Sequence, residues 1–127
     1  MSYSEYVKKT VGSMSVEEAE EIYGKMTDSL DFSNEETKEL YNELITSAIE
    51  YAGIRSGWSI LEPEERAEKD RHRTACHDAY ISNLNIFGRY FNELGLDNSW
   101  RQQIGDDRKR IGDFACYIAL FNGLGAR

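Results

Sequence analysis

The sequence is poor in proline, with one residue in 127, and it contains only two cysteines. It also has no apolar run that approaches the roughly 18 residues needed to cross a bilayer. The first ten residues, MSYSEYVKKT, lack the apolar core of a secretory signal peptide. We therefore expect a cytoplasmic protein that does not enter a membrane.

The two cysteines do not form a recognisable motif. Cys76 and Cys116 are forty residues apart, in segments with helical periodicity, and there is no CxxC pair. In a reducing compartment such cysteines commonly behave as small buried hydrophobic side chains. A disulfide is therefore not expected.

Strand signals are missing as well, because no segment alternates apolar and polar residues over the length of a strand. Charged residues make up 30% of the chain and hydrophobic residues 40%, a balance typical of helices with solvated faces. A chain of 127 residues can bury a core without disulfides or metal. We predict an all-α protein, a single helical domain over residues 1–127 folded as a compact bundle of about four to six helices.

Negative charge is concentrated in the first half of the chain. Residues 1–62 contain thirteen acidic and five basic residues, whereas residues 63–127 contain ten of each, so the net charge of −8 belongs to the first half. An acidic surface repels nucleic acid and anionic membranes. This pattern favours either a basic protein partner or solubility alone.

Two helices are predicted in the acidic half, and each starts with a capping box. Ser15 with Glu18 marks the start of the first helix, and Ser33 with Glu36 marks the start of the second. Apolar residues then recur at spacings of three and four, which gives each helix one apolar face. The other faces carry most of the carboxylates: Glu17, Glu18, Glu20, Glu21, Glu35, Glu36, Glu39, Glu43 and Glu50.

Residues 53–61, with the sequence GIRSGWSIL, form the least regular stretch of the chain. We predict a turn or short loop here, with Trp58 and Ile60 packed into the core. The next residues, Glu62-Pro63-Glu64-Glu65, are typical of a helix start, because proline suits the first turn and carboxylates favour the positive end of the helix dipole.

A long helix from about residue 63 to residue 94 is predicted to pack on a C-terminal helix from about residue 100 to residue 122. Gly95 is a suitable C-terminal cap for the long helix. The first third of this helix is charged, so its early turns are expected to project past the core. Gly105 could break the C-terminal helix in two.

The C-terminal helix contains the tripeptide Ile-Gly-Asp twice, at residues 104–106 and 111–113. A separation of seven residues is two helical turns, so the copies would share a face. Glycine inside a helix costs roughly 1 kcal/mol relative to alanine, and a close crossing of two helices would compensate for this cost. We therefore predict that the long and C-terminal helices cross near Gly88 and Gly112, and that Arg89 pairs with the aspartate of either copy.

A metal site is one alternative function. His72 and Cys76 are four residues apart and share a helical face, His77 follows directly, and Cys116 lies on the C-terminal helix. These four side chains could form a zinc site, although they lack the short paired spacing of known zinc modules. In the absence of such a site, no cofactor is expected.

A hydrolase is a related alternative, because the chain offers histidine and carboxylate side chains for acid-base chemistry. No signature spacing such as HExxH or a P-loop accompanies them. The simpler interpretation is a packed histidine with surface or capping carboxylates. The residues concerned are His77, Asp78, Asp106, Asp107 and Asp113.

Residues 70–122 resemble a family of small, functionally uncharacterised proteins of Gram-positive bacteria and of their phages and conjugative elements. The residues that carry the resemblance are His77-Asp78-Ala79, Asn83, Arg89-Tyr90, Asp97-Asn-Ser-Trp-Arg101, Gly105-Asp-Asp-Arg108 and Ile111-Gly-Asp-Phe-Ala-Cys-Tyr-Ile118. The resemblance implies a mobile-element accessory protein, a class that includes anti-CRISPR and anti-restriction inhibitors. It assigns no functional residue.

Charge and resemblance together favour a non-enzymatic inhibitor of a basic, nucleic-acid-handling protein, such as a CRISPR effector nuclease. Electrostatic complementarity would speed the encounter and set specificity, without direct binding to nucleic acid. A structural or oligomerising protein, monomeric or homodimeric, is a second alternative in which acidity means only solubility. The predicted partner-binding residues are Glu17, Glu18, Glu20, Glu21, Glu35, Glu36, Glu39 and Glu43.

Overall fold

The computed structural model describes residues 3–123, apart from the side chain of Ser59, and every regular element in this range is helical. The prediction of a compact all-α fold is confirmed. The elements are α1 (Tyr3–Thr10), α2 (Val16–Thr27), α3 (Glu35–Gly57), the short 3-10 helix η1 (Trp58–Ile60), α4 (Pro63–Glu93), α5 (Ser99–Ile104) and α6 (Arg108–Phe121). None of these helices is both long enough and apolar enough to cross a membrane.

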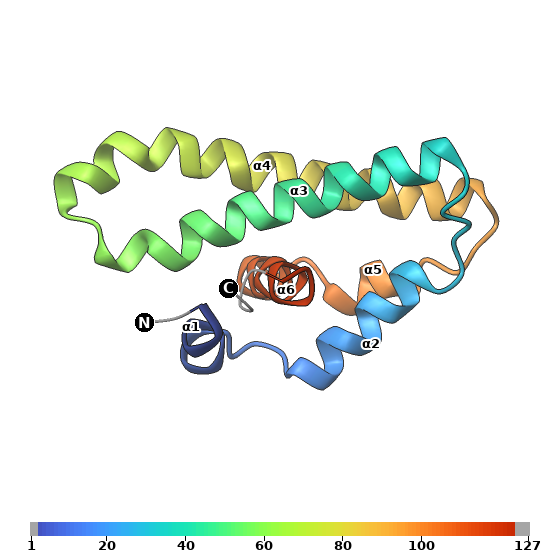
Figure 1. Ribbon diagram of the computed structural model, residues 1–127, viewed down its shortest axis with the longest axis horizontal. Helices are drawn as coiled ribbons and strands as arrows, with labels where there is room; N and C mark the ends of the chain where they lie inside the picture. The colour runs from blue at the N-terminus through green and yellow to red at the C-terminus, as the bar shows by residue number, and fades with distance from the viewer. Residues whose placement is uncertain (1–2, 124–127) are drawn as a thin grey trace.

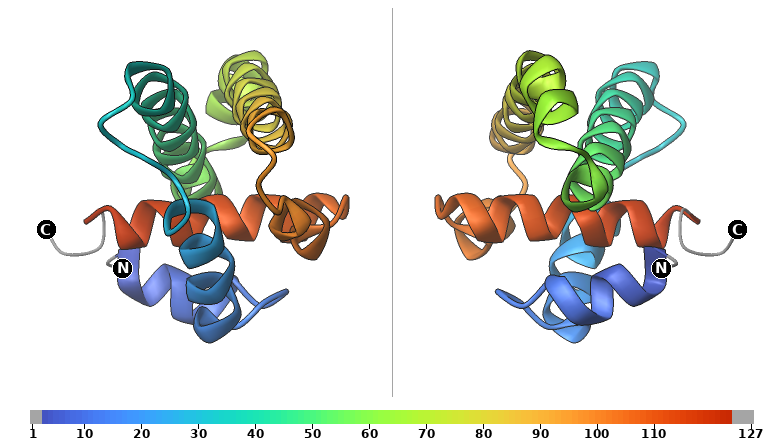
Figure 2. Two further views of the ribbon diagram at one scale, coloured as in Figure 1. Left: turned by 90° about the vertical axis from the view of Figure 1, so that its right-hand side faces the viewer. Right: turned by 90° about the vertical axis from the view of Figure 1, so that its left-hand side faces the viewer.

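The helices form three layers around α6 (Figures 1 and 2). The first layer is the antiparallel pair α3 and α4. The second is α6, which crosses beneath both of them, together with α5. The third is formed by α1 and α2 on the far side of α6, so α6 is covered from both directions.

The central position of α6 follows from its sequence. Every residue from 111 to 119 is buried, as expected for a helix with neighbours on all sides. Its start is fixed by Asp107, whose side chain accepts hydrogen bonds from the backbone N–H groups of Lys109 and Arg110 at 2.9 and 3.1 Å. The predicted break at Gly105 is confirmed, because this glycine has a φ of 83° and separates α5 from α6.

The long helix α4 was predicted closely. It begins with Pro63 in its first turn and a capping box between Glu62 and Glu65, and it is followed by Gly95 at a φ of 72°. It packs on both C-terminal helices: the Tyr80 hydroxyl donates to the backbone oxygen of Ile111 in α6 at 3.0 Å, and Trp100 of α5 lies beneath its second half. Its early turns are exposed and project past α6, as expected (Figure 1).

The prediction for residues 53–61 was wrong in most respects. Helix α3 continues through both glycines to Gly57, and η1 follows. The Trp58 ring lies partly exposed under the guanidinium of Arg73, 4.7 Å from the ring centre, and Ile60 is 83% exposed. The helix persists because Arg55, between the two glycines, is held by an ion pair to α6, and this tertiary contact outweighs the propensity cost.

One predicted helix start and one predicted capping box also need correction. The N-cap of α3 is Asn34 rather than Ser33, and its side chain accepts from the backbone N–H of Thr37 at 3.1 Å. Ser15 is the N-cap of α2, as predicted. The other half of its capping box is replaced, because the Glu18 carboxylate accepts instead from Arg110 of α6 at 2.6 Å.

The predicted crossing of Gly88 against Gly112 does not exist. A Cβ atom at Gly88 would lie 3.6 Å from the Arg101 side chain of α5. One at Gly112 would lie 2.1 Å from Nη1 of Arg55 in α3. Gly112 therefore makes room for Arg55, whereas a Cβ at Gly88 would be in ordinary van der Waals contact with Arg101. Helix α3 is the main partner of α6.

The buried ion pair at Asp113 also differs from the prediction. Its carboxylate is 1% exposed and accepts from Arg55 Nη2 at 3.0 Å, from Lys109 Nζ at 3.3 Å and from the backbone N–H of Ser13 at 3.0 Å. Arg89 is exposed and contacts neither copy of the tripeptide aspartate; in the other copy Asp106 pairs with Arg101 at 3.3 Å. Asp113 thus joins α3, α6 and the loop before α2.

Candidate functional site

The eight predicted partner-binding carboxylates lie on two separate surfaces. Glu17, Glu18, Glu20 and Glu21 belong to α2, and Glu35, Glu36, Glu39 and Glu43 belong to α3. The acidic start of α2 and the helix α3 lie on opposite sides of α6 (Figures 1 and 2). Proximity in the sequence therefore does not place the two groups on one binding face.

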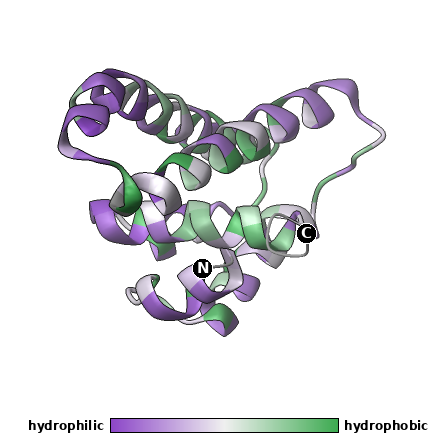
Figure 3. Cartoon of the chain, turned by 60° about the vertical axis from the view of Figure 1, so that its left-hand side comes forward, coloured by the Kyte–Doolittle hydropathy of each residue, from purple (hydrophilic) through white to green (hydrophobic). Residues whose placement is uncertain are grey.

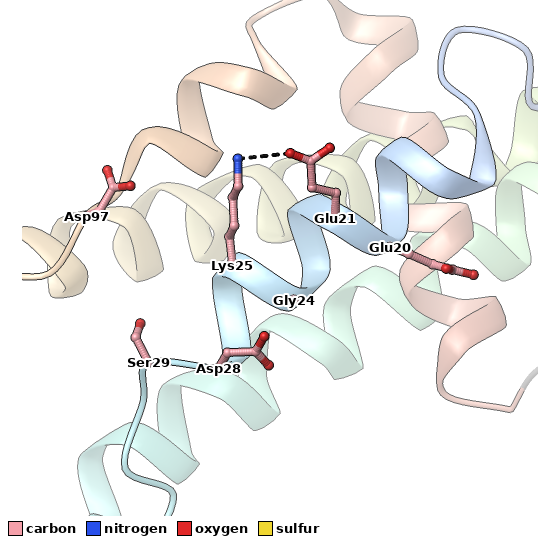
Figure 4. Close-up of a pocket in the computed structure, with 7 residues that line it drawn as sticks. All are labelled: Glu20, Glu21, Gly24, Lys25, Asp28, Ser29 and Asp97. Atoms are coloured by element: carbon pink, nitrogen blue, oxygen red, sulfur yellow. Dashed lines mark ion pairs between the residues drawn. The ribbon is translucent and has the colours of Figure 1, made fainter.

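The surface of α2 is only partly available for a partner. Glu18 is half-buried in its ion pair with Arg110, and Glu21 pairs with Lys25 at 3.2 Å, as the dashed line in Figure 4 shows. Glu20 points away from this pair (Figure 4), and both Glu17 and Glu20 are exposed. A shallow hollow with Asp97 on its other side adjoins them, but Lys25 within it neutralises part of the negative charge.

The surface of α3 carries unpaired negative charge. We define the α3 stripe as Glu36, Glu39, Glu43 and Glu50, all of them exposed. At 3.6 residues per turn the four side chains fall within about 60° of one another around the helix axis, over a rise of about 21 Å. Within the part of the chain that the structure describes, no side chain of the α3 stripe makes an ion pair or a hydrogen bond.

A shallow groove of about 310 Å³ runs beside the α3 stripe, between α3 and α4. Glu43 and Glu50 line it, with Ser47 on the same helix and Asn83 opposite on α4. The Asn83 side-chain amide donates to the backbone oxygen of Glu43 at 3.2 Å and to the Ser47 hydroxyl at 3.1 Å, which fixes the two helices against each other here. Glu50 was predicted to lie on the acidic face of its helix, but neither Glu50 nor Asn83 was among the predicted binding residues.

The four predicted metal ligands are not brought together. Cys76 Sγ lies 3.8 Å from His72 Nε2, whereas His77 Nδ1 lies 3.2 Å from the carboxylate of Asp78. Cys116 lies within α6, where its backbone oxygen accepts from the Tyr3 hydroxyl at 2.5 Å. Among residues 3–123 no group of three or more histidine, cysteine or acidic side chains is arranged to hold a metal ion.

Neither thiol is activated as a nucleophile. Burial, with a further contribution from the nearby Glu50 carboxylate, raises the pKa of the Cys76 thiol. Burial likewise raises the pKa of Cys116. Both cysteines are buried and free, and a raised pKa favours the unreactive thiol over the thiolate.

The predicted hydrolase residues are dispersed as well. Asp107 caps α6, Asp106 faces solvent beside Arg101, and Asp113 is buried in its ion pair. His77 and Asp78 lie on α4, where the His77 ring packs edge-on against Tyr51. Acid-base catalysis needs a convergent acid and base around one reacting atom, and these side chains do not converge.

No family model, curated protein or solved structure matches this chain. The case for a function therefore depends on the chemistry of the surface, where the α3 stripe is a row of four exposed carboxylates that make no ion pair.

Proposed function

We propose that the protein binds a basic, nucleic-acid-handling protein through the α3 stripe and inhibits it by covering its nucleic-acid-binding surface. A CRISPR effector nuclease is the proposed target, which gives the protein an anti-CRISPR-like role. The observation that carries the proposal is the row of four exposed and unpaired carboxylates on one face of α3.

The spacing of the α3 stripe supports this choice of target. Glu39 and Glu43 are one helical turn apart, a rise of about 6 Å, so the charges form a narrow line rather than a diffuse patch. A protein that grips nucleic acid presents lysine and arginine to a comparable line of phosphates. Such a surface would attract the α3 stripe and exclude the nucleic acid that competes for it.

The packing of α3 also supports a role in binding. A flexible acidic segment would lose entropy on binding, but α3 is fixed by its apolar face on α6 and by the contacts of Asn83 across the groove. The carboxylates are therefore held in line before a partner arrives. The proposed resemblance of residues 70–122 to mobile-element proteins would fit an inhibitor of host defence.

The test compares two variants with the same change in net charge. The stripe variant carries Glu39→Lys and Glu43→Lys, and the control carries Glu17→Lys and Glu20→Lys, all at exposed positions without an ion pair. Each would be titrated into cleavage reactions of guide-loaded CRISPR effector nucleases from Gram-positive bacteria. We expect at least a tenfold loss of inhibition for the stripe variant and little change for the control.

Salt provides a second readout of the same interface. Inhibition by the wild-type protein should weaken steeply between about 50 and 200 mM salt, as expected for an interface formed mainly by exposed charges. Added duplex DNA should compete with the protein for the nuclease. Inhibition that does not change with salt concentration, or that falls equally in both variants, would exclude the α3 stripe as the interface. Absence of inhibition of every CRISPR effector nuclease tested would exclude the proposed target.

A further inference from the structure

The end of the α3–α4 pair that carries η1 projects past α6 (Figure 1). We define this hairpin tip as residues 53–73. From residue 62 to residue 75 all side chains except Arg66 and Arg73 are exposed, and these two share one helical face that contacts Trp58. The other faces of these turns are polar and gain little from packing in their own chain, so they are available for a partner.

Apolar groups lie directly before this exposed helix. Ile60 is 83% exposed, and within residues 3–123 the other large exposed hydrophobic side chain is Leu94, at 49%. Figure 3 shows the short hydrophobic stretch that directly precedes α4 next to the hydrophilic start of that helix. A groove of about 210 Å³ lies at the same end of the molecule, lined by Ile54, Trp58 and Leu61 among others.

The floor of the groove is open because two glycines contribute to it. Gly53 and Gly57 are four residues apart on α3, and a Cβ atom added at either position would meet no atom within 4 Å. The same end of the molecule therefore carries a protruding apolar side chain and an open groove, which Lys69 and His72 line together with the apolar residues. This combination is expected in a two-fold contact, where one patch must fit a copy of itself.

The charges of the hairpin tip fit a second copy better than another partner. Residues 53–73 contain five acidic and five basic residues, so the tip is neutral in a chain with a net charge of −8. Two strongly acidic molecules repel each other elsewhere on their surfaces. Along α4 the order is mainly acidic first, with Glu64, Glu65 and Glu68, and then mainly basic, with Lys69 and Arg71.

We propose that the hairpin tip is the contact of a homodimer. The first turns of α4 from two copies would lie antiparallel, so that the acidic turns of each copy face the basic turns of the other. The Ile60 side chain of each copy would occupy the groove of the other copy. A foreign partner of one charge would complement only half of these turns, whereas an identical chain complements both.

Sedimentation of the intact protein tests the apolar part of the proposal. We expect the wild-type protein to shift from monomer to dimer between about 1 μM and 1 mM, the range in which modest interfaces associate. Ile60→Asp should weaken association at least tenfold, the effect of losing one central apolar contact. Leu94→Asp, the matched control, should dimerise as the wild type does. A monomer at every concentration, or equal association of both variants, would refute the contact.

A charge exchange tests the antiparallel pairing. One variant carries Glu64→Lys and Glu68→Lys, and the other carries Lys69→Glu and Arg71→Glu, which makes the two tips strongly basic and strongly acidic. Each variant alone should remain monomeric, and an equimolar mixture should form a heterodimer. Circular dichroism would verify that both variants are folded. A mixture that associates no better than its components would overturn the pairing, whatever the nuclease assays show.

Discussion

Asp113 offers the sharpest test of how this fold is held together. Replacing it with asparagine keeps the size and shape of the side chain but removes its charge. Asparagine also places an amide N–H₂ group where one carboxylate oxygen accepts hydrogen bonds. Arg55 Nη2 and the Ser13 backbone N–H are both donors at 3.0 Å from the carboxylate, so at least one of them would meet another donor.

The expected cost follows from burial. The Asp113 carboxylate is 1% exposed and the Arg55 side chain is 18% exposed, so the arginine would stay largely buried without its counter-charge. Removing one member of a buried ion pair costs about 3–5 kcal/mol, and the residual exposure of Arg55 favours a value of about 3 kcal/mol. For a domain of this size that corresponds to a fall in Tm of about 10–15 °C.

The other copy of the tripeptide supplies the control. The Asp106 carboxylate is 97% exposed and pairs with Arg101 at 3.3 Å, so Asp106→Asn should cost less than about 1 kcal/mol. Thermal and urea unfolding of both variants would give the two values. A double-mutant cycle with Arg55→Met should show coupling of about 1 kcal/mol or more between Arg55 and Asp113. Equal stability of the two asparagine variants would refute the reasoning.

Two further predictions concern packing and pH. Gly112→Ala should destabilise the fold by about 1–3 kcal/mol, because its Cβ would lie 2.1 Å from Arg55 Nη1. Gly53→Ala should stabilise the fold by up to about 1 kcal/mol, because a Cβ at that position meets no atom within 4 Å. Equal urea midpoints for the two variants would contradict this prediction. Burial, with a contribution from Cys116, raises the pKa of the Tyr6 hydroxyl to about 12, so the fold favours the neutral phenol. The contribution of the neutral Tyr6 phenol to stability should be complete below about pH 10, the pKa of an unfolded tyrosine, and should be lost as the pH rises to 12. The loss of stability over this range should be smaller in Tyr6→Phe. A free energy of unfolding that does not change between about pH 10 and 12 would exclude a contribution from Tyr6.

The elements that the sequence predicted well are those whose signals are local. The start of α4 depends on Glu62, Pro63 and Glu65, and its end on Gly95, all within one turn of the boundary. The extension of α3 to Gly57 was missed because it depends on a contact between Arg55 and α6, which is distant in the sequence. Tertiary contacts override helix propensity in such cases.

Helical geometry alone could have excluded Arg89 as the ion-pair partner of Asp113. Arg89 lies two residues from both Phe87 and Phe91, and both phenylalanines are buried. Two residues along a helix correspond to about 200°, which places Arg89 on the opposite, solvent-facing side. This geometry excludes Arg89 as the ion-pair partner of Asp113. It does not identify Arg55 as that partner, because the sequence does not show that α3, rather than α4, packs over Gly112.

The candidate site was predictable only in part. The carboxylates of α3 were recognised from their spacing, and they are exposed in the structure. The sequence could not show that the start of α2 faces another direction, or that Glu18 is engaged by Arg110, because both depend on the path of the chain around α6. Whether the α3 stripe binds a partner remains a prediction.

The central position of α6 has a consequence for biosynthesis. The ribosome completes α1 to α5 before it synthesises α6, the helix on which most of them pack. Ser13 can donate its hydrogen bond to Asp113 only after a further hundred residues have been synthesised. Before that point α3 and α4 can pair with each other, but their faces towards α6 stay uncovered, and α1 and α2 have no layer to join. The chain should therefore fold in one late step, and truncations that remove α6 should yield aggregation-prone protein rather than a smaller stable unit.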